Sequence, residues 1–291
     1  MNLFVFGYGY SSATLVRAYR DRFAQVRATV RGAAKAQSLT ADGVTGRIFD
    51  GSVADDAIAA DLAASDALLV SVPPDAAGDP VLRRFADAVA ASPRLAWIGY
   101  LSTVGVYGDH GGGWVDEATP PNPANERSVR RLEAEEAWLA LGRSSGKAVH
   151  VFRLAGIYGP GQNALVNLRE GTARRIVKPG QVFNRIHVED IAGAAMASLA
   201  RPSAGTVYNV TDDEPAPPQD VVAFAAGLMG VPVPPDLPFE SAALSPMARS
   251  FYSENKRVSN RLLKDRLGYA MRYPTYREAL RALFAAGDGR D

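Results

Sequence analysis

The sequence predicts an α/β fold, a doubly wound parallel sheet followed by a smaller C-terminal α/β domain. Short apolar runs, typical of buried strands, alternate with segments of helical periodicity through the first half of the chain. The first apolar run ends in a glycine-rich turn that leads directly into a helical segment. The length of 291 residues allows one large domain or two smaller ones.

The first strand and the first helix are joined by residues 7–12, Gly-Tyr-Gly-Tyr-Ser-Ser. Gly7 allows a tight turn, and Gly9 lets the backbone approach a pyrophosphate. Ser12 stands where the third glycine of G-x-G-x-x-G is usual, and the new helix presents free N–H groups to phosphates. The alternative is an ordinary strand-to-helix turn. We predict dinucleotide binding by Gly7, Gly9, Tyr10, Ser11 and Ser12.

The second and third strands, predicted at residues 26–30 and 46–49, end in charged residues. Arg31 follows the second strand, where proteins that prefer NAD carry an acidic residue, and Lys35 is close behind. These positive charges suit a 2′-phosphate, or else form a solvated basic loop. Asp50 follows the third strand and either accepts from the adenine amino group or is a turn residue. We predict NADP as the cofactor, with NAD as the alternative.

The fourth strand, at residues 67–72, is a continuous apolar run of the kind buried on both faces of a sheet. It ends at Pro73 and Pro74, where ligands bind in open α/β sheets. We therefore add Val72, Pro73 and Pro74 to the cofactor site. The alternation continues with a helix at 81–91, a strand at 95–101, a helix at 127–141 and a strand at 149–154.

The composition excludes several classes of protein. Net charge +1 gives no argument for a nucleic-acid or membrane partner, and no apolar run reaches membrane-spanning length. The chain has no cysteine, and its three histidines lie in separate segments, so we expect no metal site. The first strand begins almost at once, without a basic leader or cleavage site. We expect a cytoplasmic protein that acts on a small molecule.

Four later segments complete an ordered set of motifs: Leu-Ser-Thr-Val-Gly-Val-Tyr-Gly at 101–108, Arg-Leu-Ala-Gly-Ile-Tyr-Gly-Pro-Gly at 153–161, Asn-Arg-Ile-His-Val-Glu-Asp-Ile-Ala at 184–192, and Val-Tyr-Asn-Val at 207–210. The set resembles the extended short-chain dehydrogenases/reductases of the NAD-dependent epimerase/dehydratase type. The resemblance implies a Rossmann-type dinucleotide-binding domain of residues 1–163 and 183–210. A small substrate-binding domain of residues 164–182 and 211–291 would complete the chain.

The chain departs from this family at its catalytic pair, Tyr-x-x-x-Lys, and so resembles an atypical branch. Alignment puts Arg127 in the place of the tyrosine and Arg131 in the place of the lysine. An arginine can hold a ribose, but it does not shuttle protons. The alternative for both is a charge ladder with Glu135 along one helix face. The later Tyr-x-x-x-Lys of residues 252–256 comes too far along the chain to match the catalytic pair.

The chain retains only some of the family's other catalytic residues. Thr103 matches the family's substrate-binding Ser/Thr, whereas Val104 and Gly105 replace the carboxylates of its dehydratases. Gly156 stands where nucleotide-sugar enzymes often carry asparagine, so we expect neither dehydratase nor epimerase chemistry. Tyr107 is either structural or a substitute proton donor.

Two residues of the 184–192 segment are predicted to bind substrate, Arg185 and His187; for His187 the alternative is a satisfied histidine beneath a loop. We expect an NADP-dependent oxidoreductase that acts on a small carbonyl or hydroxyl compound. The alternative is a catalytically degenerate NAD(P)-binding sensor or scaffold. The resemblance also implies a homodimer through the helices at 81–91 and 127–141.

Overall fold

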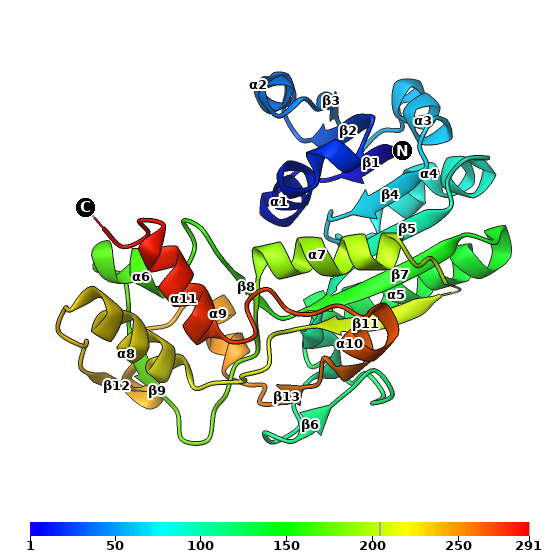
Figure 1. The fold of residues 1–291 in the computed structure, drawn as a ribbon. Helices are drawn as coiled ribbons and strands as arrows, with labels where there is room; N and C mark the ends of the chain where they lie inside the picture. The colour runs from blue at the N-terminus through cyan, green and yellow to red at the C-terminus, as the bar shows by residue number, and fades with distance from the viewer. Residues whose placement is uncertain (204, 291) are drawn as a thin grey trace.

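A sheet of seven parallel strands forms the centre of the computed structural model, which describes residues 1–203 and 205–290 (Figure 1). The strand order is β11–β7–β5–β4–β1–β2–β3. The order reverses next to β1, and such a reversal opens a crevice at the carboxyl ends of the strands. This arrangement confirms the predicted fold class. The strands are β1 (Asn2–Phe6), β2 (Gln25–Val30), β3 (Thr45–Ile48), β4 (Ala67–Val70), β5 (Trp97–Thr103), β7 (Ala148–Leu154) and β11 (Thr206–Val210).

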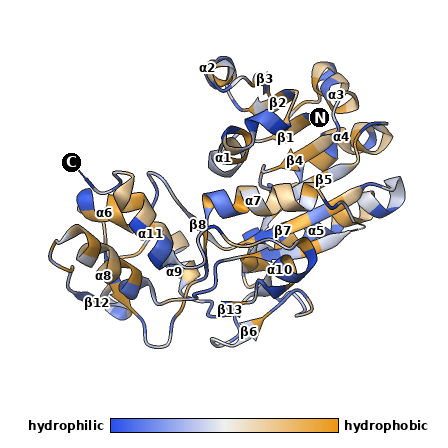
Figure 2. Cartoon of the chain, viewed as in Figure 1, coloured by the Kyte–Doolittle hydropathy of each residue, from blue (hydrophilic) through white to orange (hydrophobic). Residues whose placement is uncertain are grey.

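Helices cover both faces of the sheet, and its strands are correspondingly apolar (Figure 2). Leu3 and Val5 of β1 pack in the same cluster as α1 (Tyr10–Ala18), α7 (Val188–Leu199) and α10 (Arg261–Leu267). Phe4 and Phe6 pack with α3 (Asp56–Ala63), α4 (Pro80–Ala91) and α5 (Glu126–Ser145). Successive side chains of a strand point to opposite faces, so an uninterrupted apolar run serves both layers.

The strands and helices predicted for the first half are confirmed, with small shifts at their ends. Two short helices were not predicted, α2 (Ala33–Ser38) and α3. They have six and eight residues, too few for an apolar stripe to stand out from the sequence. Helix α2 lies against β2 and β3, and Gly46 makes this possible because a Cβ there would meet the Ala36 carbonyl oxygen at 2.2 Å.

A second, smaller cluster lies to the left of the sheet in Figure 1. Its core joins α6 (Ala164–Arg169), α8 (Pro218–Met229) and α11 (Tyr276–Ala285). A parallel pair of short strands, β9 (Arg175–Val177) and β12 (Asp236–Pro238), and helix α9 (Pro246–Phe251) complete it. Helix α11 begins with a capping box: the Thr275 hydroxyl accepts from the Arg277 N–H, and the Glu278 carboxylate accepts from the Thr275 N–H.

Short strands form two-stranded sheets outside the large sheet, and one C-terminal helix packs on the large sheet. Strand β8 (Gly156–Tyr158) pairs with β10 (Arg185–His187), and β6 (Trp114–Val115) pairs with β13 (Arg257–Val258). Leu263 and Leu267 of α10 belong to the core cluster of the sheet, because their spacing of four puts both on the face that meets β11 and α7. Residues 257–267 were predicted in the small domain, yet they pack on the larger one. In the described ranges no helix is both long and apolar enough to cross a membrane.

Candidate functional site

The turn between β1 and α1 has the geometry of a phosphate cradle. Gly7 has φ of +87°, and a Cβ there would come within 3.0 Å of the Val72 side chain, so glycine is required. Gly9 is the N-cap of α1 with φ of −104°, and a Cβ there would meet nothing within 4 Å. The first N–H groups of α1, from Tyr10 and Ser11, have no i−4 acceptor within the helix. The open space in front of Gly9 and these donors fit a pyrophosphate.

Ser12 stabilises this turn by two hydrogen bonds. Its side chain is fully buried, its hydroxyl donates to the Gly7 carbonyl at 2.7 Å, and the same oxygen accepts from the Gly9 N–H at 2.9 Å. The prediction that Ser12 binds the cofactor is therefore corrected, because its hydroxyl is used within the turn. Thr29 adds a contact that the sequence did not predict: its buried hydroxyl accepts from the Gly7 N–H at 3.0 Å.

Tyr10 reaches from the start of α1 to a distant loop. Its hydroxyl donates to the Pro160 carbonyl at 3.0 Å, and burial is the main cause that raises its pKa to about 12. A Cβ on Gly159 would lie 2.6 Å from this hydroxyl, so the loop approaches Tyr10 closely only because residue 159 is glycine. Tyr10 thus ties the cofactor turn to the segment that follows β8.

The residues predicted near the adenosine end lie at the carboxyl ends of β2 and β3, which are neighbours in the sheet. Arg31 is exposed, and it has no ion pair with any carboxylate of the described residues. Asp50 is also exposed, and its carboxylate accepts from the backbone N–H and the hydroxyl of Ser52, which holds the pKa of Asp50 below its usual value. The carboxylate is thus already used in a turn, as the alternative expected.

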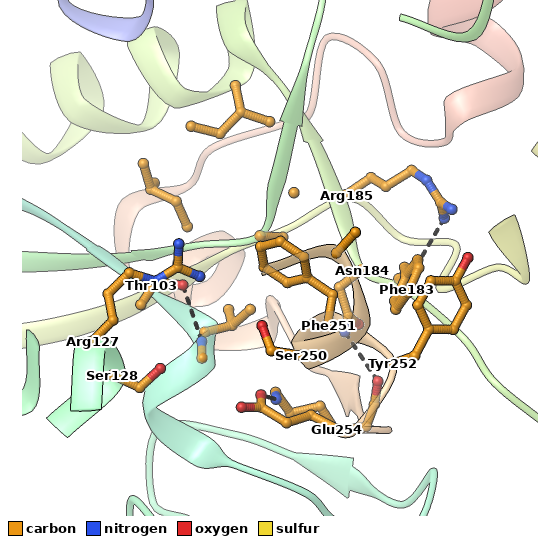
Figure 3. A pocket seen from close by; sticks show the side chains of 18 of the residues that line it. Thr103, Arg127, Ser128, Phe183, Asn184, Arg185, Ser250, Phe251, Tyr252 and Glu254 are labelled. Atoms are coloured by element: carbon orange, nitrogen blue, oxygen red, sulfur yellow. Dashed lines mark hydrogen bonds and ion pairs between the residues drawn. The ribbon is translucent and has the colours of Figure 1, made fainter. Parts of the chain in front are cut away.

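A cavity of about 940 Å³ lies between the sheet and the smaller cluster. Pro73, which follows β4, lines it, so the cavity adjoins the predicted cofactor site. Figure 3 shows Thr103, Arg127 and Ser128 along one side and Phe183, Tyr252 and Arg185 along the other. Residues of both halves of the chain therefore face one space, as a site for a cofactor and a second reactant requires.

The two arginines at the start of α5 both line the cavity, but they make different contacts. Arg131 donates from Nη1 to the Tyr100 hydroxyl at 3.0 Å and to the Leu101 carbonyl at 2.8 Å, which ties α5 to β5. Arg127 is exposed, with its guanidinium carbon 5.4 Å from the centroid of the Phe251 ring.

The charge ladder with Glu135 is wrong, because Glu135 is buried in an ion pair with Arg153 of β7, at 2.8 Å. That pair lies beneath the site, and the Ser102 hydroxyl donates to the same carboxylate. Glu135 is thus a buried anchor between α5 and the sheet, and it leaves both arginines of the cavity without an acidic partner on their own helix.

Thr103 is joined by a second hydroxyl that the sequence did not predict. The Thr103 hydroxyl accepts from the Gly105 N–H at 3.1 Å. A Cβ on Gly105 would lie 2.9 Å from the Ser128 hydroxyl oxygen and 3.4 Å from that of Thr103, so the two hydroxyls flank the same point. Ser128 is positioned by the start of α5, where the Asn125 side chain accepts from its backbone N–H at 3.0 Å. Its place directly after Arg127 was the signal available in the sequence.

Tyr107 does not reach the cavity. Its side chain is fully buried and its hydroxyl donates to the Asn209 side chain at 2.8 Å. The Arg153 guanidinium lies over its ring at 4.8 Å, and burial raises the pKa of Tyr107. The prediction of Tyr107 as a substitute proton donor is therefore wrong, because a neighbour about a hundred residues away holds the hydroxyl.

Arg185 and His187 are neighbours in β10 but differ in their surroundings. Arg185 lines the cavity and donates from Nη1 to the carbonyl oxygens of Phe183 and Ala216, at 2.9 and 3.0 Å. Burial lowers its pKa. Asp212 lies nearby and is itself buried, which raises its pKa to about 8.

His187 is fully enclosed and does not line the cavity. Its Nδ1 accepts from the Glu189 N–H at 3.3 Å and caps α7, while its Nε2 has no partner among the described residues. Burial, and then the charge of Arg272, lowers the pKa of His187 to about 4, so the ring is neutral at pH 7. The predicted substrate contact is corrected, because His187 does not line the cavity; the alternative of a satisfied histidine holds only for its Nδ1.

The spacing argued against the late Tyr-x-x-x-Lys segment as the catalytic pair, yet this segment lines the cavity. Tyr252, Glu254 and Lys256 all line it. The Lys256 ammonium lies 2.6 Å from the Glu254 carboxylate, and both side chains are largely buried. Among the described residues, no group of three or more acidic or histidine side chains is placed to hold a metal ion.

Known proteins resemble this chain in sequence. The family model described as the NAD dependent epimerase/dehydratase family matches residues 84–211. The protein YeeZ of Escherichia coli K12 is 31% identical over 190 residues, 58% of this chain and 61% of that protein. A 3-diazoavenalumate denitrifying reductase of a Streptomyces species is 31% identical over 180 residues, 57% of this chain and 55% of that protein. The matches thus span less than two thirds of each relative.

Solved structures match over nearly the whole chain. A functionally unknown conserved protein from Silicibacter pomeroyi is 48% identical, with a TM-score of 0.89 and 99% of each chain covered. The dTDP-glucose 4,6-dehydratase of Bacillus anthracis, solved in complex with NAD, has the same fold at 17% identity, with a TM-score of 0.78 and 99% of this chain and 97% of that chain covered. Residues 84–211 of this chain thus belong to the NAD-dependent epimerase/dehydratase family, and nearly the whole chain has the fold of a solved dehydratase.

Proposed function

We propose that this protein is an NADP-dependent reductase of a small carbonyl compound that carries an anionic group on a flat apolar body. The observation that carries the proposal is the cavity itself. It brings two hydroxyls, Thr103 and Ser128, to the side where Arg127 and Arg131 replace the family's usual pair. The reductase name of one relative supports the reaction class.

The residues of α5 and β5 suit the oxygen of a carbonyl group. Bound NADPH would supply a hydride to the carbonyl carbon. Thr103 and Ser128 line the same cavity, and their hydroxyls can donate hydrogen bonds to the oxygen as negative charge develops there. Arg131 keeps its Nη1 on the Tyr100 hydroxyl and the Leu101 carbonyl, and its other N–H groups are proposed to hold the nicotinamide ribose.

The opposite wall indicates the shape and charge of the substrate. Phe183 and Tyr252 meet edge to face at 5.0 Å between centroids, and Phe251 adds a third ring nearer the arginine side. Aromatic walls favour a flat apolar group. Arg127 has no ion pair with any described carboxylate, so its guanidinium is available to a substrate carboxylate or phosphate.

Preference for NADP is supported by Arg31, which is exposed and unpaired at the end of β2. A guanidinium suits a 2′-phosphate, whereas an acidic residue there would favour NAD. We also propose that the protein acts in the cytoplasm, supported by the absence of cysteine.

A degenerate sensor is the second candidate function, and one observation favours it. The tyrosine position holds Arg127, while the nearest tyrosine in sequence, Tyr107, is bonded to Asn209. Such a protein would bind NADPH and turn over nothing. Turnover therefore separates the two candidates.

The test is NADPH oxidation with phenylglyoxylate, a ketone that carries an aromatic ring and a carboxylate. The proposal expects turnover, and it expects Thr103→Val to lower kcat/KM about 100-fold or more, because one oxyanion donor is lost. Thr40→Val, at an exposed threonine of the first domain, is the matched control and should match the parent protein. NADPH binding without oxidation of this compound would favour the sensor.

A further inference from the structure

The ion pair of Glu254 and Lys256 has no part in the function proposed above, although it lines the same cavity as Thr103 and Ser128. The Lys256 Nζ lies 2.6 Å from Glu254 Oε2, and the two side chains are only 6% and 12% exposed. Removing both charges from water is costly, and replacing such a pair by apolar residues is often neutral or stabilising. A buried pair that faces a ligand-sized cavity is therefore a candidate for chemistry.

Both side chains of the pair are held by residues from the first half of the chain. Lys256 Nζ donates to the Gly108 carbonyl at 2.6 Å, directly after the segment that carries Thr103. The Asn125 side chain, which caps α5, donates to Glu254 Oε1 at 3.2 Å. Side-chain fixation of this kind is what a group needs to act at a fixed point on a substrate.

The backbone around the pair is fixed as well. The Gln181 side chain donates to the Glu254 carbonyl at 2.8 Å, and the Asn184 side chain donates to the Lys256 carbonyl at 3.0 Å. Asn184 also accepts from the Val258 N–H at 2.9 Å. The segment that precedes β10 thus fixes the backbone of residues 254–258 beside the cavity by hydrogen bonds.

Other groups of the cavity are poor proton donors. Arginine side chains such as those of Arg127 and Arg131 do not shuttle protons. Tyr158 and Tyr252 also line the cavity, but burial raises the pKa of both phenols. Figure 3 shows the Tyr252 hydroxyl on the side of Arg185, away from Thr103.

We propose that Lys256, held by Glu254, donates the proton to the substrate oxygen, in place of the tyrosine that this chain lacks. The inference rests on the proposed reductase function. As the carbonyl carbon gains a hydride from NADPH, the π electron pair of the C=O bond moves to oxygen. An O–H bond forms there, directly or through one water, while an N–H bond of Lys256 breaks and leaves its electron pair on nitrogen. The carbonyl is reduced, the NADPH is oxidised, and water reprotonates the amine.

The test uses the full chain with NADPH and phenylglyoxylate. Lys256→Met keeps the length of the side chain without the proton, and it should lower kcat about 100-fold or more. Its residual rate should no longer fall as the pH rises. Lys147→Met is the matched control: that ammonium donates to the Ser92 and Leu95 carbonyls and does not line the cavity, so its kinetics should not change.

Chemical rescue separates a proton donor from a merely structural lysine. Lys256→Ala opens space for a small amine, so added methylammonium should restore at least about tenfold of the lost rate, and a quaternary ammonium of similar size should not. Glu254→Gln removes the countercharge and should move the alkaline fall in rate to lower pH. Calorimetry of NADPH binding should give the same affinity for all variants, which checks that the fold and the cofactor site are intact.

The outcomes are distinct. Suppose that the parent protein turns over the ketone. An unchanged kcat and pH profile in Lys256→Met would then contradict the role of Lys256 as proton donor, and so would a loss of turnover in Lys256→Ala that no amine restores. In either case the proposal of a reductase would still hold. Parent protein that binds NADPH and never oxidises it with phenylglyoxylate contradicts the reductase, and the proton donor falls with it. Loss of turnover that methylammonium restores supports both.

Discussion

The arginine at position 131 makes contacts that the family's usual lysine could not make. A lysine would be a compact charge on a flexible stem, whereas Arg131 divides its fork between the Tyr100 hydroxyl, the Leu101 carbonyl and the cavity. It also lies over the Tyr100 ring, with its guanidinium carbon 5.6 Å from the centroid. Arg131 thus stabilises β5, the strand that ends at Thr103, and also faces the cavity.

Arg31 is the residue expected to decide the choice of cofactor. Arg31→Ala should weaken NADPH binding about 10- to 100-fold and leave NADH nearly unchanged, because only NADPH carries the phosphate for a charge-assisted hydrogen bond. Titration calorimetry with both nucleotides measures this. Equal losses, or a parent protein that prefers NADH, would contradict the assignment.

His187 makes stability depend on pH. Its pKa is about 4 in the folded chain and about 6.5 when unfolded, so the unfolded state binds more protons between these values. Its contribution to the free energy of unfolding is complete above about pH 6.5 and is lost as the pH falls toward 4. Asp212, with a pKa raised to about 8, acts in the opposite direction, so the parent protein alone does not isolate the effect.

The comparison with His187→Asn isolates it, because asparagine keeps an acceptor for the Glu189 N–H but does not titrate. The difference in unfolding free energy between the parent and the variant should shift against the parent by about 2 kcal/mol from pH 7 to pH 5. Urea unfolding at several pH values measures it. A difference that does not change with pH would show that His187 is not held neutral.

At the scale of the element, a substitution in the turn before α1 can change cofactor binding without changing the fold. A Cβ at Gly9 meets nothing within 4 Å, and its φ of −104° is open to any residue. Gly9→Val should therefore fold normally and lower NADPH affinity at least about tenfold, because the new methyl groups occupy the pyrophosphate space. Gly227→Val, at an equally open glycine of α8, is the control. If folded Gly9→Val binds NADPH as tightly as the parent protein does, this turn does not bind the pyrophosphate.

Elements differ in how far the sequence alone predicts them. The β1–turn–α1 unit follows from neighbouring residues, since Gly7, Gly9 and Ser12 act on one another locally. Tyr107 does not, because its partner Asn209 comes from a strand at the far edge of the sheet. Glu254 and Lys256 belong to a Tyr-x-x-x-Lys segment that is visible in the sequence, but its position along the chain gives no sign of its place in the cavity. That place depends on the pairing of β13 with β6 and on the bond from the Asn184 side chain to the Lys256 carbonyl.

At the scale of the whole molecule, the cavity exists only where the two halves meet. Thr103, Ser128 and Arg127 come from the sheet side, and Phe183, Tyr252 and Arg185 come from segments that border the smaller cluster. In the proposed function, a substrate in this cavity would touch both halves. Ligands that occupy this space are expected to hold the halves together.

We propose a homodimer through α4 and α5, which contact each other on one face of the sheet. Val129 is the exposed large apolar residue of these two helices within the described ranges. Sedimentation should show a dimer at micromolar concentration, and Val129→Glu should shift it toward monomer because a buried charge opposes association. A parent protein that sediments only as a monomer would exclude this interface.

The measurement that tests the account most directly is the turnover of phenylglyoxylate with NADPH by the double variant Arg127→Tyr with Arg131→Lys, beside the parent protein. If the arginines hold the substrate anion and brace the oxygen site, the parent turns over the ketone. The variant then loses about 100-fold or more in kcat/KM although the family's usual pair is restored. A variant as active as the parent, or an inactive parent whose variant gains turnover, would contradict the account.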